Sequence, residues 1–304
     1  MNRANDTCVL CGASGLVTRR YLKLDSRDWK RNIAYGIPSA AADALSRLSS
    51  KFAAAYRPVR VNRKYFDRDA VYCKSCGTGR AVPPLVESEL AEYYAEFYWE
   101  NRDSADGQHI PAIDRPNETQ VSLARDRLAW LARFVDGYGS ALDFGAGDCA
   151  ATYVLKLNQR DVHVVDPSRR AQELAGRYGA TYSGTLEAAP VVDMIYSAHS
   201  IEHVADLRAT VACLIEKVRN GGYLFFETPN VDLAVFSGMG HTPHTYMLSE
   251  ESFRMLAGMH GMELIALEVL GPPWNKTHPA VVSDARSDLR VLLRKPASAS
   301  AASP

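Results

Sequence analysis

The chain has 304 residues, of which 47% are hydrophobic and 23% charged, with 35 basic and 35 acidic side chains. This length and composition allow a full core and predict a soluble globular protein with one domain of about 200 residues plus a smaller module. No apolar run reaches the ~18 residues of a membrane span, and residues 1–6 lack the charged-then-apolar plan of a secretory signal. We therefore expect a cytoplasmic protein that does not enter a membrane.

The charge is unevenly distributed. Residues 1–80 carry 16 Lys and Arg against 6 Asp and Glu, a net charge of +10, whereas residues 81–304 carry a net charge of −10. Such an asymmetry is typical of a module that meets an anionic partner, such as a nucleotide-linked substrate, a carrier protein or a nucleic acid. Attraction between the two halves across an internal interface explains it equally well.

Two C-x-x-C pairs, each followed by glycine, lie in the basic part of the chain. Cys8 and Cys11 form the first pair, and Cys73 and Cys76 form the second. Two such knuckles supply four thiolates for a tetrahedral structural Zn²⁺, which leaves no open position for catalysis. The segment between them is longer than the usual ribbon spacing, and disulfides or a redox pair are the alternatives. We favour zinc because a cytoplasmic setting keeps thiols reduced.

The region between the cysteine pairs has helical periodicity first and basic residues afterwards. Residues 38–56 predict one amphipathic helix, with an apolar face of Ala42, Leu45, Leu48, Phe52 and Ala55. Basic residues then alternate with apolar and aromatic ones through residues 56–68. This interleaving occurs in nucleic-acid-binding surfaces, but it equally describes solvated strands of a small zinc module, which we favour.

Two segments separate the second cysteine pair from the larger half. A helix is predicted to begin near Ser88 and to contain the pair Tyr93-Tyr94. Residues 104–116, rich in Asp, Gly and Pro, are typical of a loop or lid.

The stretch from Ser140 to Asp148 reads as a buried strand that runs into a glycine turn. Gly145 and Gly147 have no Cβ, so the backbone can turn with positive φ and approach a ligand at the carboxyl edge of a sheet. A second apolar strand ends at Asp166, at the spacing where a carboxylate accepts both ribose hydroxyls.

Asp143, Gly145, Gly147 and Asp166 match the D-x-G-x-G-x-G motif and the second-strand acid of class I S-adenosylmethionine-dependent methyltransferases, which this chain resembles. The family's third glycine is replaced by Cys149, a change we expect to be modest because Cys packs as a small hydrophobe. The resemblance implies S-adenosyl-L-methionine as cofactor. The residues it assigns to cofactor binding are Asp143, Gly145, Ala146, Gly147, Asp166, Pro167, Ser197 and His199.

Strands and helices alternate after residue 117, as in a doubly wound α/β sheet. Strands are predicted at 140–145, 161–166, 180–183, 191–197, 222–228, 262–270 and 287–295, and helices at 118–136, 149–159, 169–178, 205–219 and 249–260. The resemblance implies a seven-stranded Rossmann-like methyltransferase domain whose last strand runs antiparallel. We divide the chain into a zinc-binding module with a helical insertion (1–85), a linker with a helix and lid (86–117), the class I methyltransferase domain (118–296) and a disordered tail (297–304).

Candidate catalytic residues follow the predicted strands. Methyl transfer is an in-line displacement, so the protein positions two reactants and removes a proton from an oxygen or nitrogen acceptor. His199 and His203 follow the strand at 191–197, and His244 and Tyr246 lie in a later loop. We favour His244 as the base, its alternative being a loop histidine that bonds backbone.

The sequence H-x-x-E-H, from His199 to His203, also allows a role other than catalysis by its histidines. It could hold a divalent ion if its side chains lie on one helical turn. Alternatively, Glu202 and His203 fix the turn and line the cofactor pocket.

The leading interpretation is a methyltransferase of natural-product biosynthesis that acts on oxygen, nitrogen or carbon of a sugar nucleotide or secondary metabolite. The expected partner is a small-molecule acceptor, nucleotide-linked or carrier-linked, rather than a nucleic acid or a membrane. The alternatives are a zinc-ribbon RNA methyltransferase and a non-catalytic scaffold that binds a cofactor or partner.

Overall fold

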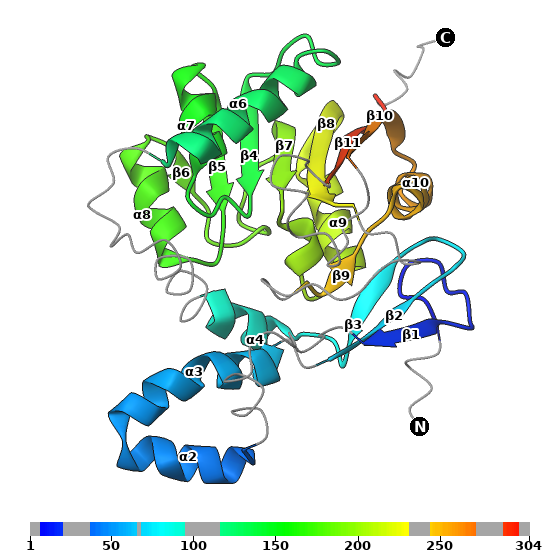
Figure 1. Ribbon diagram of the computed structural model, residues 1–304. Coiled ribbons are helices and arrows are strands. Elements are labelled where there is room, and N and C mark those ends of the chain that lie inside the picture. Colours follow the sequence, from blue (N-terminus) through cyan, green and yellow to red (C-terminus); the bar gives the residue numbers. More distant parts are fainter. Residues whose placement is uncertain are drawn as a thin grey trace, which may run out of the picture.

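The computed structural model describes residues 7–20, 37–65, 68–94, 116–230, 244–271 and 288–297. Two sheets organise these residues (Figure 1), a four-stranded sheet of order β1-β2-β3-β9 and a seven-stranded sheet of order β10-β11-β8-β7-β4-β5-β6. Most of the predicted lid and of the predicted disordered tail lies outside the described residues. Over the described part of the chain, every helix is too short or too polar to cross a bilayer.

The seven-stranded sheet has the predicted doubly wound form. Its strands are β4 (Ser140–Phe144), β5 (Asp161–Val165), β6 (Thr181–Tyr182), β7 (Val192–Ala198), β8 (Val218–Pro229), β10 (Glu263–Leu270) and β11 (Asp288–Arg294). The five neighbouring strands β6, β5, β4, β7 and β8 pair in parallel. Strand β11 pairs antiparallel with both β8 and β10. The α/β fold class and the antiparallel last strand are therefore confirmed.

Helices cover both faces of this sheet, which explains why its central strands are almost continuously apolar. The helices are α6 (Glu118–Leu131), α7 (Ala150–Leu157), α8 (Arg169–Arg177), α9 (Leu207–Glu216) and α10 (Glu250–Met259). Alternate residues of β8 pack against the helices on opposite faces of the sheet. Phe225 packs with α6 and α7, whereas Leu224 and Phe226 pack with α9 and α10.

The small sheet joins the cysteine-bearing N-terminal region to the segment just before α10. Its strands are β1 (Val17–Arg20), β2 (Asp69–Tyr72), β3 (Gly79–Val82) and β9 (Tyr246–Met247). Strand β9, which the sequence assigned to the methyltransferase domain, pairs antiparallel with β3, and Tyr246 lies opposite Arg80. Cys8 and Cys76 also belong to the same hydrophobic cluster as Phe253 of α10. The cysteine-bearing region and the large domain are thus packed together.

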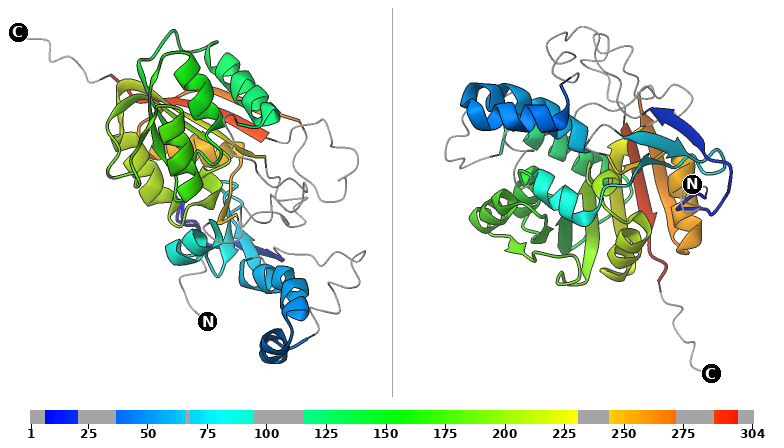
Figure 2. Two further views of the ribbon diagram at one scale, coloured as in Figure 1. Left: turned by 90° about the vertical axis from the view of Figure 1, so that its left-hand side faces the viewer. Right: turned by 90° about the horizontal axis from the view of Figure 1, so that it is seen from below.

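The segment between β1 and β2 forms a helical hairpin, α2 (Ser39–Leu48) and α3 (Ser50–Tyr65), which projects from the rest of the molecule (Figures 1 and 2). The predictions of one helix over 38–56 and of strands beyond it were wrong. The break has a local cause, because Ser49 is extended (φ −146°) and its Oγ accepts a hydrogen bond from Phe52 N at 3.3 Å. Leu48 of the predicted apolar face is 83% exposed.

The linker begins with helix α4 (Glu87–Glu92), close to the predicted start. Its first turn is held by Glu89, whose carboxylate accepts a hydrogen bond from Val86 N at 3.1 Å. Tyr93 follows directly and is buried against Tyr65 of α3, with the ring centroids 5.0 Å apart.

Candidate active site

Asp143, at the end of β4, is buried and fastens the helix that follows the glycine turn. Its Oδ2 accepts hydrogen bonds from Thr152 N (3.0 Å) and Thr152 Oγ1 (2.6 Å), both on α7. Burial raises the pKa of Asp143 to about 7, although these two bonds oppose the shift. Since the carboxylate is turned toward α7, Asp143 shapes the turn through its bonds to Thr152.

The turn itself contains three residues in the left-handed region. Gly145, Gly147 and Cys149 have φ of 73°, 55° and 56°. A Cβ on Gly145 would lie only 2.1 Å from Ser200 Oγ, so a side chain at this position would collide with the segment after β7. Glycine is therefore required at 145 by both conformation and contact.

Cys149 adopts this conformation with a side chain, which explains why the family carries glycine here. A left-handed residue with a Cβ costs about 1–2 kcal/mol. The thiol is fully buried and lies 3.6 Å from Ala171 O of α8, and burial raises its pKa. The side chain therefore lies in the core between α7 and α8.

Asp166 closes the turn from the end of β5. Its Oδ2 accepts from Gly147 N at 2.8 Å, and its Oδ1 accepts from both Ser168 N (2.8 Å) and Ser168 Oγ (2.6 Å). A carboxylate oxygen has two lone pairs, and no described residue uses the second one on Oδ2. Ala146 is half-buried and Pro167 exposed in the two turns. Asp166 can thus accept one ligand hydroxyl without losing its present bonds.

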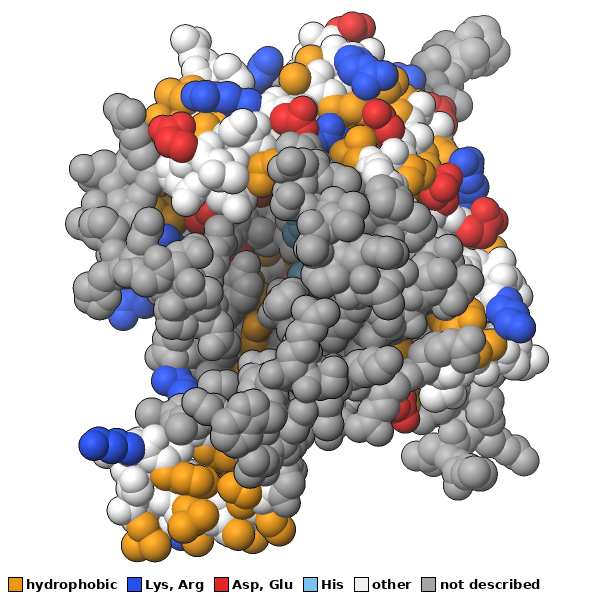
Figure 3. Space-filling model, viewed as in Figure 1, with side chains coloured by type: hydrophobic (Ala, Val, Ile, Leu, Met, Phe, Trp, Pro, Cys, Tyr) orange, Lys and Arg blue, Asp and Glu red, His pale blue; other side chains and the backbone are white. Residues whose placement is uncertain are grey.

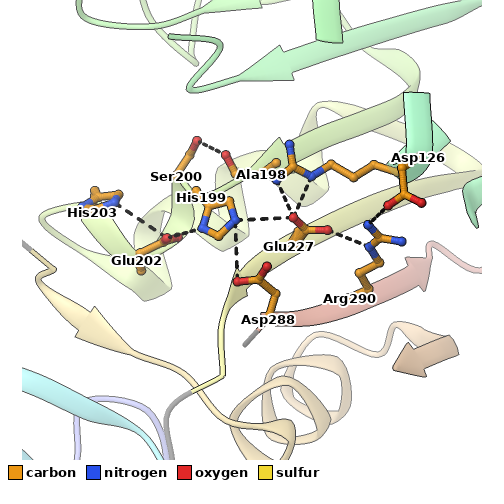
Figure 4. A network of polar contacts seen from close by, with 10 residues as sticks. Asp126, Ala198, His199, Ser200, Glu202, His203, Glu227, Asp288 and Arg290 are labelled. Atoms are coloured by element: carbon orange, nitrogen blue, oxygen red, sulfur yellow. Dashed lines mark hydrogen bonds and ion pairs between the residues drawn. The ribbon is translucent and has the colours of Figure 1, made fainter. Parts of the chain in front are cut away.

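His199 follows β7 and faces a group of carboxylates. Its Nδ1 lies 3.6 Å from Glu202 Oε1, and its Nε2 lies 3.4 Å from Glu227 Oε1 and 3.8 Å from Asp288 Oδ1 (Figure 4). Burial opposes the charged form, but the contacts with Glu202 and Glu227 and the charge of Asp288 outweigh it and raise the pKa of His199 to about 10. A histidine that is charged at neutral pH does not accept a proton, which argues against His199 as the base.

Glu227, on β8, is held between two arginines that the sequence analysis did not single out. Arg127 Nε of α6 donates to Glu227 Oε1, and Arg290 Nε of β11 donates to Oε2, each at 2.6 Å. Arg290 also pairs with Asp126 at 2.5 Å (Figure 4). The arginines lie 100 and 63 positions away from Glu227, so no local pattern connects them. The only signal was a carboxylate at the carboxyl end of a strand.

A second group of polar side chains forms where η3 (Ile201–His203) meets the segment before β9. Glu202 is 1% exposed, and its Oε1 lies 3.7 Å from His203 Nε2. The rings of His203 and His244 meet at a centroid distance of 4.5 Å and an angle of 63°. Burial, reinforced by His203, lowers the pKa of His244 to about 3. We call Glu202, His203 and His244 the histidine centre.

Two tyrosines near the histidine centre differ in what they contact. In Figure 3, parts of histidine side chains are visible in pale blue on the face of the molecule that Figure 1 shows. Tyr94 packs against the ring of His203 at 6.0 Å. Tyr246, predicted to be catalytic, donates its hydroxyl to Ala205 O at 3.1 Å and is buried. Its phenol is therefore bonded to backbone and holds the segment that follows η3 against the small sheet.

The four paired cysteines meet in space. Cys8 Sγ lies 3.5 Å from Cys76 Sγ, and Cys11 Sγ lies 3.5 Å from Cys73 Sγ. All four sulfurs lie within 4.8 Å of one another, and none of the chain's six cysteines forms a disulfide. Sulfurs at about 2.3 Å from a tetrahedral Zn²⁺ are about 3.8 Å apart. The cluster is thus compatible with the predicted zinc module.

Comparisons with known proteins agree with this fold. The family model of a methyltransferase domain matches residues 114–267, and a comparison with curated proteins gives no match. Similar solved structures include the [4+2]-cyclase SpnF, with TM-score 0.53 and 14% identity over 70% of this chain and 97% of that one. Another is 1,6-didemethyltoxoflavin-N1-methyltransferase from Burkholderia thailandensis, with TM-score 0.51 and 16% identity over 74% of this chain and 98% of that one.

At such identities the structural likeness establishes the fold, while the family match covers half of the chain. The match begins in the linker and runs through the glycine turn, the histidine centre and β9 into β10. The expected resemblance, the enzyme class and the fold are confirmed together. The chain belongs to the methyltransferase-domain family of S-adenosylmethionine-dependent enzymes.

Proposed function

We propose that the protein transfers a methyl group from S-adenosyl-L-methionine to oxygen, nitrogen or carbon of a small-molecule acceptor. One observation carries the proposal: the glycine turn and the histidine centre are fastened to each other. Ser200 Oγ donates to Gly145 O at 3.1 Å, and Glu202 and His203 follow two and three residues later. A donor at the turn and an acceptor at the centre would therefore meet.

The donor side would use groups that the described residues leave available. The methionine sulfonium of the cofactor supplies an electrophilic methyl group. Asp166 Oδ2 retains a lone pair for a hydroxyl, as described above, and the positive-φ turn at Gly145 and Gly147 permits close approach of a ligand. Ser197 is fully buried at the end of β7, and its Oγ has no hydrogen-bond partner among the described residues.

The acceptor side would use the histidine centre to assist loss of the acceptor's proton. His203 lies beside the Glu202 carboxylate, which stabilises positive charge on an imidazole. His244, favoured from the sequence, is neutral but only a weak base because its pKa is lowered. We therefore assign the leading role to His203 and a supporting one to His244, whose ring packs against it.

The test is a screen of candidate acceptors with labelled methyl donor, followed by His203→Asn. We expect a ~10²–10⁴-fold loss of turnover in that variant, while calorimetry shows cofactor affinity within about twofold of wild type. His260→Gln, at the end of α10, is the matched control and should behave as wild type. Failure of the folded, zinc-loaded protein to bind the cofactor would contradict the proposal and favour a partner-binding scaffold.

A second candidate function, methylation of RNA, is favoured by the basic hairpin. Arg57, Arg60 and Lys64 of α3 are exposed. Two ion pairs join this region to the acidic part of the chain, Lys64 to Glu92 and Arg68 to Glu89. The exposed basic side chains of α3 are the part of the molecule that an external anion would meet. Salt-dependent retention on RNA would support this candidate, and no binding at about 50 mM salt would remove it.

A further inference from the structure

The structure changes the set of residues that could bind a divalent ion beside the glycine turn. The sequence pointed to His199, Glu202 and His203. The Nε2 of His199 instead faces Glu227, whose two oxygens are already bonded to arginines. His244, brought in from the segment before β9, takes its place in the histidine centre, where one ligand atom from each of the three residues lies within 4.8 Å of the others.

Glu202 provides an independent indication that this centre holds a cation. Its carboxylate is 1% exposed, and neither oxygen accepts a hydrogen bond from any described residue. The nearest nitrogens, His199 Nδ1 at 3.6 Å and His203 Nε2 at 3.7 Å, lie at ion-pair distance, so the charged His199 balances the carboxylate in part, but both are too distant to donate a hydrogen bond. A buried carboxylate is stable when a positive charge contacts it directly, and a metal ion placed among these three residues would do so.

We propose that Glu202, His203 and His244 bind one divalent transition-metal ion, separate from the structural zinc of the four cysteines. Two imidazoles and one carboxylate suit Zn²⁺, Mn²⁺ or Fe²⁺, whereas Mg²⁺ and Ca²⁺ prefer oxygen ligands. Ligands at about 2.1 Å from such an ion lie roughly 3.0–3.4 Å apart. The 3.7 Å between Glu202 Oε1 and His203 Nε2 needs to close by only a few tenths of an ångström.

Three protein ligands leave coordination positions open, which is the pattern of catalytic rather than structural sites. The role of these positions rests on the proposed function, whereas metal binding itself does not. With the ion bound, His203 would act as a ligand and not as the base, and a hydroxyl acceptor at an open position would lose its proton to solvent more readily. Its oxygen then forms a bond to the methyl carbon as the carbon–sulfur bond breaks, and the sulfonium leaves as a neutral thioether.

Metal content tests the proposal without an acceptor. After saturation with Zn²⁺ and removal of the excess, wild type should retain two equivalents per chain, whereas Glu202→Gln and His244→Ala should retain one. His260→Gln is the matched histidine control and should retain two. One equivalent in wild type, or two in Glu202→Gln, would overturn the proposal.

Mn²⁺ can probe the histidine centre separately from the four-cysteine site, because thiolate sites strongly prefer softer ions. Titration of protein that carries a single equivalent of Zn²⁺, bound by the four cysteines, should show one Mn²⁺ site by electron paramagnetic resonance, and Glu202→Gln should weaken it at least ~100-fold. Cofactor affinity by calorimetry should stay at the wild-type value in that variant, which shows that it is folded. Equal Mn²⁺ affinity in wild type and variant would refute the site even if methyl transfer is confirmed.

Discussion

The two sides of the candidate active site differ in how their carboxylates are satisfied. On the donor side, Asp143 and Asp166 bond to residues between 2 and 19 positions away. On the acceptor side, Glu227 bonds to α6 and β11, and Glu202 accepts no hydrogen bond from the described residues. Local hydrogen bonds hold the glycine turn in its conformation. In the histidine centre, which long-range contacts assemble, the Glu202 carboxylate has no hydrogen-bond donor among the described residues and can contact a ligand.

The largest expected effect is on the long-range side. Glu227→Gln would remove the carboxylate that two buried guanidinium groups share and leave only the half-exposed Asp126 beside Arg290, and breaking a buried pair costs about 3–5 kcal/mol. Urea unfolding measures this loss. Asp126→Asn is the control, because Asp126 contacts the same Arg290 from a half-exposed position and should cost at most about 1 kcal/mol. Equal costs for the two variants would mean that the network is not a buried ion-pair system.

On the donor side, Asp143 should give stability a pH dependence. Its folded-state pKa, about 7, lies above the ordinary value of 3.8, so between these values the folded chain holds a proton that the unfolded chain has released. Its contribution is fully present below about pH 4 and is lost as pH rises through 7. In Asp143→Asn the amide oxygen can still accept from Thr152, and this loss should vanish.

The measurement is the urea midpoint of both proteins from pH 5 to 8. The zinc thiolates add their own pH dependence to both proteins. The informative quantity is therefore the difference in free energy of unfolding between wild type and Asp143→Asn. It should shift by a few kcal/mol in favour of the variant as pH rises. A constant difference would show that Asp143 titrates near its ordinary pKa in the folded protein.

The third effect concerns the contact between the two sides. Gly145→Ala places a Cβ at φ 73° and 2.1 Å from Ser200 Oγ. We expect a loss of about 2 kcal/mol in stability and weaker cofactor binding by calorimetry. Adding Ser200→Gly should recover the part that is due to the collision but not the part that is due to φ. No recovery would show that the backbone conformation alone accounts for the loss.

The sequence predicts the features that depend on local contacts and misses those that depend on long-range contacts. The strands of the seven-stranded sheet, the helices over it, the glycine turn and the paired cysteines were predicted, because each depends on periodicity or short spacing. Arg127 and Arg290 were not, since their partner Glu227 is distant in the chain. The helix break at Ser49 was missed because a single serine cap outweighed a continuous apolar pattern. Strand β9 was missed because its pairing partner, β3, lies more than 160 residues earlier.

The smallest effect is at Cys149, where strain and burial oppose each other. Glycine relieves the left-handed backbone but removes the buried thiol, so Cys149→Gly alone does not separate the two. Cys149→Ala also loses the thiol but keeps a Cβ at φ 56°, and its difference from Cys149→Gly isolates the strain. We expect the glycine variant to be more stable than the alanine variant by about 1 kcal/mol, measured as a shift in thermal midpoint. Alanine is ordinarily favoured over glycine within helices, so an alanine variant of equal or greater stability would mean that the left-handed conformation at 149 costs the turn nothing.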